Sequence, residues 1–172
     1  ELKEFTERYF QMILVINQIT DENYRCSTIK RLIEILLEND LELARKMMGN
    51  VVSNNLQVNN LLLPYIETLV KMGVSVEEII SWFDYFDIKN YNEESISMKL
   101  QILLLIYKSD WYDKKEKEDI KEKIKYYADK GWISTPVQWD EELFKFYLDF
   151  CQKENVEIHL RRMTQEQDND TN

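Results

Sequence analysis

The sequence predicts an all-α protein, and three features carry this prediction. The chain holds only 3 Gly and 2 Pro in 172 residues, whereas tight turns, β-hairpins and phosphate-binding loops depend on glycine. Apolar residues recur at spacings of three and four along most of the chain, which is the period of an amphipathic helix. The stretch from Leu100 to Ile106 is almost entirely apolar, as in a helix that is covered on several sides. We therefore expect residues 95–107 to form the centre of the core.

About eight helices follow from the apolar spacing. Gly49 falls inside the third of them, where it costs roughly 1 kcal/mol against alanine and could allow close packing with a neighbour. A single extended connection, WISTPVQW at 132–139, precedes the last long helix. The predicted helices cover residues 2–19, 21–38, 40–54, 57–72, 75–87, 93–108, 114–130 and 140–154, with a short helix over 156–163.

Several residues are expected to begin or end these helices. Pro64 lies inside the fourth helix, so that helix either begins near residue 63 or is kinked at the proline. Gly73 is the residue type expected just past a helix end. The side chains expected to cap helix N-termini are Thr20 or Asp21, Ser75, Asn92 and Asp140.

The starts of alternate predicted helices recur every 35 to 38 residues. Such a period is typical of stacked helical hairpins. The stretch LELARKMMGNVVSNNLQVNNLLLPYIETLVKMGVSVEEIISWFDYF resembles tetratricopeptide and pentatricopeptide repeats in its rhythm, over roughly residues 40–108. The tetratricopeptide positions for Trp, Leu-Gly and Tyr are not met in order. The resemblance implies four antiparallel hairpins stacked as a short α-solenoid, and an irregular helical bundle is the alternative.

We expect one helical-repeat domain over residues 1–163 and a disordered polar tail over 164–172. Because the chain begins with Glu1 and not with Met, we expect a domain from a larger protein. No apolar run is long enough to span a membrane, and no signal peptide is apparent. Cys26 and Cys151 lack a CxxC partner and are expected to be reduced thiols of an intracellular protein, in the cytoplasm or the nucleus.

Catalytic chemistry finds little support in the sequence. His159 is the only histidine and the two cysteines are not clustered, so the usual zinc sites cannot be assembled. A Ser/His/Asp triad would have to use His159, which lies near the polar tail. Acidic residues in the fifth helix are better explained by the helix dipole than by a carboxylate pair. No GxxxxGK[ST], GxGxxG or GxSxG motif occurs. We expect no enzymatic activity, no metal and no cofactor.

Aromatic residues are the best candidates for a binding surface, since interfaces favour Trp and Tyr. On a regular α-helix, Trp82, Tyr85 and Phe86 would share one face, which would either be buried between layers or form part of a partner groove. The candidate partner-binding residues are Trp82, Tyr85, Phe86, Trp111, Tyr112, Trp132 and Trp139.

The first helix is apolar on more than one side, so Phe5, Tyr9 and Phe10 are candidates for an end-face contact with preceding repeats or a second copy. The net charge of −10 disfavours nucleic acid and favours a partner with basic residues. We expect a protein–protein interaction scaffold that binds through a solenoid groove or a terminal hairpin. The alternative is a pentatricopeptide-like RNA-binding module, with Arg45, Lys46 and Asn50 facing the RNA.

Overall fold

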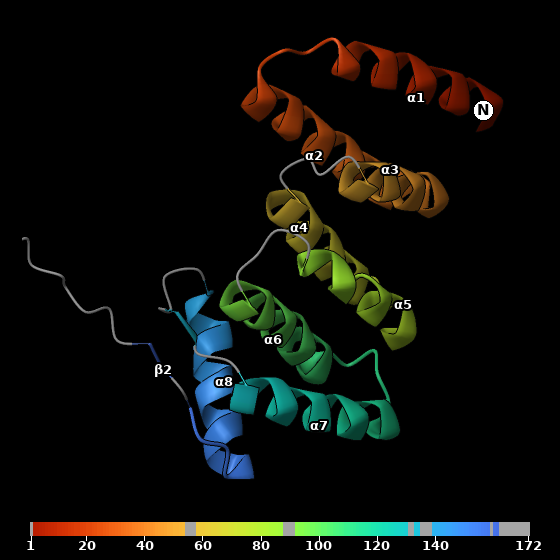
Figure 1. The fold of residues 1–172 in the computed structure, drawn as a ribbon. Coiled ribbons are helices and arrows are strands. Elements are labelled where there is room, and N and C mark those ends of the chain that lie inside the picture. Colours follow the sequence, from red (N-terminus) through yellow and green to blue (C-terminus); the bar gives the residue numbers. More distant parts are fainter. Residues whose placement is uncertain are drawn as a thin grey trace, which may run out of the picture. The chain divides into compact units, whose positions relative to one another are not determined.

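A computed structural model describes residues 2–53, 58–87, 92–130, 133–134, 139–158 and 160–161. Over these residues the protein contains eight α-helices, which confirms the predicted all-α class (Figure 1). The elements are α1 (Leu2–Asn17), α2 (Glu22–Asn39), α3 (Leu41–Ser53), α4 (Val58–Lys71), α5 (Val76–Ser81), the 3₁₀-helix η1 (Phe83–Phe86), α6 (Asn92–Lys108), α7 (Lys114–Lys130), β1 (Ile133–Ser134), α8 (Glu141–Glu154) and β2 (Leu160–Arg161).

The chain forms two compact units, residues 1–68 and residues 69–172. The packed helices are compatible with a helical-repeat architecture. Stacking of four hairpins into a solenoid, and a single domain over residues 1–163, remain predictions.

In the first unit, α1 packs against α2, and α2 packs against α3. Asp21 caps α2 as expected, because its carboxylate accepts the main-chain N–H of Tyr24 at 2.7 Å. Gly49 in α3 does not allow a close approach, since a Cβ atom built there meets nothing within 4 Å; that expectation was wrong. The buried residues of α2 and α3 are Cys26, Ile29, Leu32, Ile33, Leu36, Leu37, Ala44, Met47, Met48, Val51 and Val52.

Helix α4 begins at Val58 and contains Pro64 in its interior, so of the two alternatives for this helix the start near residue 63 was wrong. Proline has no N–H to donate to the carbonyl one turn earlier. The hydroxyl of Thr68 donates to the Pro64 carbonyl at 3.0 Å. At the other end of α4, Gly73 adopts φ 71°, and the N–H groups of Gly73 and Val74 bond back to Val70 and Leu69. This is the Schellman arrangement that a glycine after a helix favours.

In the second unit, α6 is the central element: it packs against η1, α7, β1 and α8 (Figure 1). Leu100, Ile102 and Leu103 have no exposed surface, and neither do Leu104 and Ile106. The expectation that residues 95–107 form the centre of a core is confirmed for this unit. A helix that is packed on several sides can be apolar nearly all round, because no face of it has to meet water.

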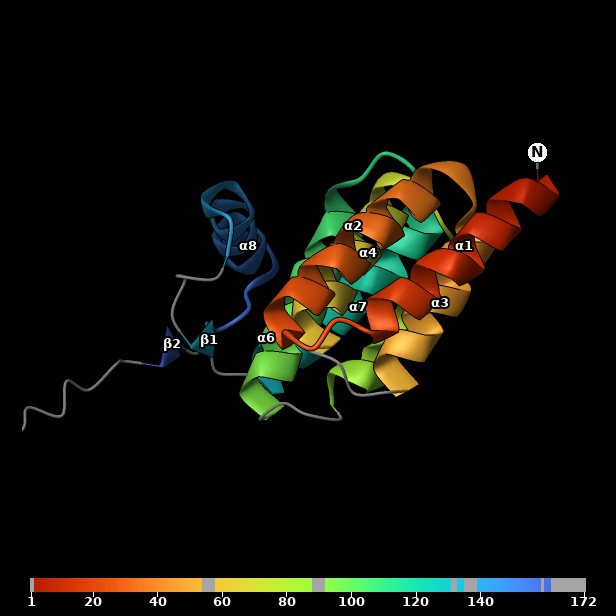
Figure 2. The ribbon, with the colours of Figure 1, turned by 90° about the horizontal axis from the view of Figure 1, so that it is seen from above.

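The C-terminal elements follow the predicted boundaries except at the end. Asp140 caps α8 by accepting the N–H groups of Glu142 and Leu143 at 2.9 and 3.1 Å. The short helix predicted over 156–163 is wrong, because residues 156–158 are not helical and β2 pairs in parallel with β1 (Figure 2). The predicted tail, residues 164–172, lies outside the described residues.

Candidate functional site

The aromatic segment at 82–86 is built differently from the prediction. Helix α5 ends at Ser81, and residues 83–86 continue as a 3₁₀-helix with three residues per turn. Side chains three apart therefore lie on the same side. Phe83 and Phe86 are buried as a pair with their ring centroids 6.3 Å apart, whereas Trp82 and Tyr85 form a half-buried pair at 5.6 Å. The predicted grouping of Phe86 with Trp82 and Tyr85 was wrong, because it assumed an α-helical period.

The turn at 109–113 lies against the connection between α4 and α5. The hydroxyl of Tyr112 donates to the carbonyl of Val74 at 2.8 Å, and the indole N–H of Trp111 donates to the carbonyl of Lys71 at 3.0 Å. Tyr112 is buried, and this burial, with the nearby charge of Glu116, raises its pKa to about 12. Trp111 remains 68% exposed.

Trp139 is a core residue in the structure. It is buried, its indole N–H donates to the hydroxyl of Ser97 at 2.7 Å, and its ring lies 5.4 Å from that of Tyr147. Burial raises the pKa of Tyr147, and the neighbouring Cys151 adds to the effect. Trp132, the other predicted residue of this loop, lies outside the described residues.

The N-terminal hairpin presents an apolar surface. Tyr9 is buried, and the side chains of Phe5 and Phe10 lie outside the described part of the structure. Three other apolar residues of α1 reach solvent: Met12 is 40% exposed, Leu14 64% and Val15 62%. An open hollow between α1 and α2 is lined by Arg8, Gln11, Met12, Val15, Ile16 and Thr28.

The sequence held a signal for this surface. Residues 12–16 form an unbroken run of five apolar side chains, MILVI, and one buried face of a helix cannot take all of them. The residues predicted for the end-face contact, Phe5, Tyr9 and Phe10, are aromatic and lie nearer the start of the helix. The exposed residues of the run are aliphatic.

The residues predicted to face RNA lie on α3. Arg45 forms an ion pair with Glu42 of the same helix, three residues earlier. Lys46 and Asn50 are exposed. The ion pair partly compensates the charge of Arg45, so the positive charge that this face presents to a phosphate backbone comes mainly from Lys46.

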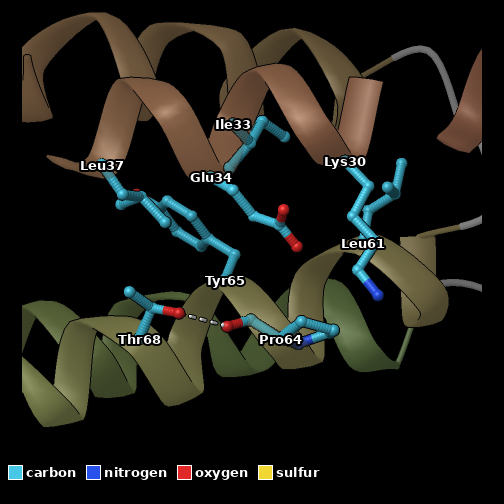
Figure 3. A pocket seen from close by; sticks show the side chains of 8 residues that line it. All are labelled: Lys30, Ile33, Glu34, Leu37, Leu61, Pro64, Tyr65 and Thr68. Carbon is cyan, nitrogen blue, oxygen red and sulfur yellow. Dashed lines mark hydrogen bonds between the residues drawn. The ribbon is translucent and has the colours of Figure 1, made fainter. Parts of the chain in front are cut away.

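A second hollow lies between α2 and α4 and is much smaller, with a volume of about 40 Å³ (Figure 3). Its apolar wall includes Ile33, Leu37 and Leu61, and the side chains of Lys30 and Glu34 extend from α2 towards α4. A volume of this size holds about one or two water molecules. It is too small for an organic ligand.

A polar cluster joins the end of η1 to the first turns of α6. The ammonium group of Lys99, which is buried, lies 2.9 Å from both carboxylate oxygens of Asp87, and the hydroxyl of Ser95 also donates to Asp87. Partial burial would raise the pKa of the Asp87 carboxyl, but the hydrogen bonds from Ser95 and Lys99 and the charge of Lys99 lower it overall. This cluster holds η1 against α6.

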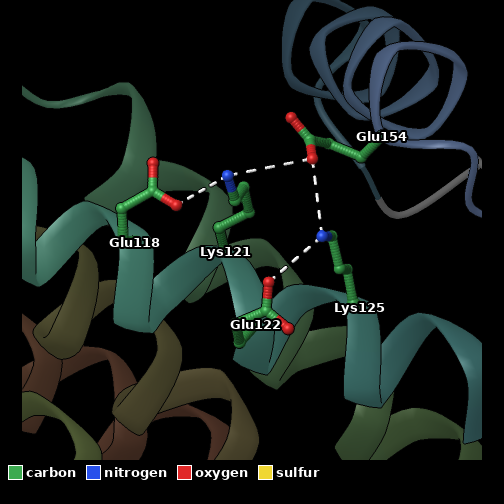
Figure 4. Close-up of polar contacts among 5 residues, drawn as sticks. All are labelled: Glu118, Lys121, Glu122, Lys125 and Glu154. Carbon is green, nitrogen blue, oxygen red and sulfur yellow. Dashed lines mark hydrogen bonds and ion pairs between the residues drawn. The ribbon is translucent and has the colours of Figure 1, made fainter.

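Ion pairs also connect α7 to α8. The carboxylate of Glu154 lies 3.9 Å from the ammonium group of Lys121 and 3.4 Å from that of Lys125 (Figure 4). Each lysine also pairs with a glutamate of α7, Lys121 with Glu118 and Lys125 with Glu122. The charged face of α7 therefore has a structural role at the contact with α8.

Within the described ranges, no group of three or more His, Cys, Asp or Glu side chains could hold a metal ion. Cys26 and Cys151 are both free and buried, and burial raises the pKa of each thiol. His159 lies outside the described residues. Among the helices that the structure describes, none combines the length and the apolar character needed to cross a lipid bilayer.

Comparison of the chain with protein-family models, with curated proteins and with solved structures finds no match. Its class therefore follows from the fold alone: an all-α protein of packed helices, in whose described part the most exposed large hydrophobic side chains are those of Leu14 and Val15 in α1, Tyr24 in α2 and Trp111.

Proposed function

We propose that this chain is a non-enzymatic protein–protein interaction scaffold that binds a partner protein through its N-terminal hairpin, α1 and α2. The observation that carries the proposal is the exposure of Leu14 and Val15, both above 60%, beside the hollow lined by Met12 and Val15. Contiguous exposed apolar side chains on a folded protein usually mark a contact surface, because hydrating them costs free energy that a partner removes.

The form of the hollow supports a protein partner over a small ligand. It is open, with two helices as its borders, and Gln11 and Thr28 stand beside its apolar side chains. An apolar groove between two helices fits the apolar face of a partner helix. A tetratricopeptide-like or pentatricopeptide-like array uses its helical hairpins as such surfaces, and the packed helices and their repeat spacing support this architecture as part of the proposal.

The proposal is tested by affinity capture with the whole chain and with two single-residue variants of α1. In Val15→Glu, a charge replaces an exposed side chain that lines the hollow. In Asn17→Glu, the same charge is introduced at an exposed polar position that does not line the hollow and lies on the other side of the helix from Val15. Both changes fall on exposed residues, so neither should lower the thermal stability by much.

We expect proteins captured by the unaltered chain and by Asn17→Glu to be lost with Val15→Glu. Retention of every captured protein by Val15→Glu would contradict the proposal. A nuclease treatment of each capture addresses the RNA-binding alternative: if nuclease removed all captured material and Val15→Glu had no effect, the chain would be an RNA-binding module.

A further inference from the structure

We propose that the exposed face of Trp111 binds an arginine side chain of a protein partner. This second surface rests on the proposed function only in that the partner is a protein. The indole is 68% exposed although its other face lies against Gly73, where a Cβ atom would come within 2.9 Å of the Trp111 Cδ2 atom. One face of the indole ring therefore lies against the main chain at Gly73, and the other face is open to solvent.

The hydrogen bonds of the turn restrict what this face can bind. The indole N–H already donates to the carbonyl of Lys71 at 3.0 Å, so it is not available as a donor to a partner. A partner is left with the π face of the ring. Groups that bind such a face are cations, which are attracted to its quadrupole, and apolar groups such as a proline ring.

Charge decides between these two. Asp110 and Asp113 flank the tryptophan within the same turn and are exposed, and the chain carries a net charge of −10. Lys108, three residues before Trp111, is paired with Glu142 of α8. Lys114 and Lys115 at the start of α7 and Lys71 at the end of α4 are exposed cations, whose sign opposes a cationic ligand. The overall charge outweighs them at long range and draws a basic segment towards the surface.

Among cations, arginine fits better than lysine. Its guanidinium group is planar, stacks on an aromatic face and is less strongly hydrated than an ammonium group. While stacked on Trp111, the same group can pair with a neighbouring carboxylate in two parallel hydrogen bonds. Asp110 is the nearer candidate, because an oxygen of Asp113 already accepts the N–H of Glu116 at 2.8 Å.

The turn is also fixed before a partner arrives. The Trp111 main-chain N–H donates to the hydroxyl of Ser109 at 3.2 Å, and Tyr112 is anchored on the carbonyl of Val74. A side chain that is already immobilised loses little conformational entropy on binding. This property is typical of the tryptophans that contribute most to the affinity of an interface.

The test follows the indole N–H signals of the ¹⁵N-labelled whole chain by NMR, with Trp111 assigned from a Trp111→Phe variant. Three capped peptides serve as probes: Arg-Gly-Arg, Lys-Gly-Lys and Pro-Gly-Pro. We expect a saturable shift of the Trp111 signal with the arginine peptide, at least about threefold tighter than with the lysine peptide, and no saturable shift with the proline peptide.

The indole signal of Trp139, which is buried, serves as an internal control and should not move. Asp110→Asn should weaken binding of the arginine peptide, and added salt should do the same. Equal affinity for the lysine or proline peptide would overturn the assignment of arginine, and an unchanged Trp111 signal would overturn the site. Neither result bears on Val15 or α1, so failure here is separate from failure of the hairpin proposal.

Discussion

The indole ring of Trp111 lies against Gly73, so that an added Cβ atom at residue 73 would come within 2.9 Å of the ring. Gly73 also adopts φ 71°, a conformation that L-residues with a side chain rarely take. Two separate constraints therefore favour glycine at residue 73. The backbone conformation is required by the end of α4, and the close contact comes from a turn almost forty residues later in the chain.

We expect Gly73→Ala to lower the free energy of unfolding by about 1–2 kcal/mol from the backbone conformation alone, and by more where the ring cannot move aside. The two causes separate in a double-mutant cycle with Trp111→Ala. In that background only the backbone cost should remain, so Gly73→Ala should cost less than in the unaltered chain. Equal costs in both backgrounds, measured by urea unfolding, would show that the ring does not restrict residue 73.

Gly49 provides the opposite case. It lies within α3, and a Cβ atom there meets nothing within 4 Å. Alanine is favoured over glycine in a helix interior by about 1 kcal/mol, since it restricts the unfolded chain more. We therefore expect Gly49→Ala to raise the free energy of unfolding by up to about that amount, measured by the same urea titration. A decrease would mean that residue 49 touches a neighbour.

Local signals in the sequence predicted much of this fold. Asp21, Ser75 and Asp140 were recognisable as caps because a cap depends on residues within one turn of it. The buried run from Leu100 to Ile106 was recognisable because a covered helix needs no polar face.

The features that escaped prediction depend on geometry or on distant contacts. The change from α-helix to 3₁₀-helix at Phe83 alters which aromatic residues share a side, and no residue type specifies that change. The bond from Trp111 to the carbonyl of Lys71 joins residues 40 apart in the chain. The pairing of β1 with β2 is likewise long-range and involves only two residues on each strand. The sequence pattern placed Trp111 in a turn, but the carbonyl that accepts its indole N–H could be found only in the structure.

Tyr112 should make the stability depend on alkaline pH. Its pKa is raised to about 12 in the folded chain, against an ordinary value of 10.0. Between these two values the unfolded chain has lost a proton that the folded chain still holds, so rising pH favours unfolding. The contribution is complete below pH 10 and is lost as the pH approaches 12.

Tyr112→Phe should reduce the dependence of unfolding free energy on pH in this window by up to one proton. At neutral pH the variant should be less stable by about 1 kcal/mol, because the carbonyl of Val74 loses its donor. Tyr126→Phe is a suitable control, since Tyr126 is exposed. Urea titrations at several pH values from 8 to 11 give the slopes. An unchanged slope for Tyr112→Phe would contradict the raised pKa.

Glu154 should contribute to the contact of α8 with α7 through the two lysines that it faces. Their ammonium groups lie 3.4 and 3.9 Å from its carboxylate, and all three side chains are at least partly buried, so the attraction is less screened than on an open surface. The hydrogen bond with Glu118 raises the pKa of Lys121, and the hydrogen bond with Glu122 raises the pKa of Lys125. The charge of Glu154 raises both pKa values further, so both lysines stay charged at neutral pH.

We expect Glu154→Gln to lower the melting temperature, and added salt to reduce the difference between the variant and the unaltered chain. Glu118→Gln is the matched control, because Glu118 is an exposed carboxylate that pairs only within α7, and its effect should be smaller. If the two substitutions had equal effects at low salt, the ion pairs would not contribute to the attachment of α8.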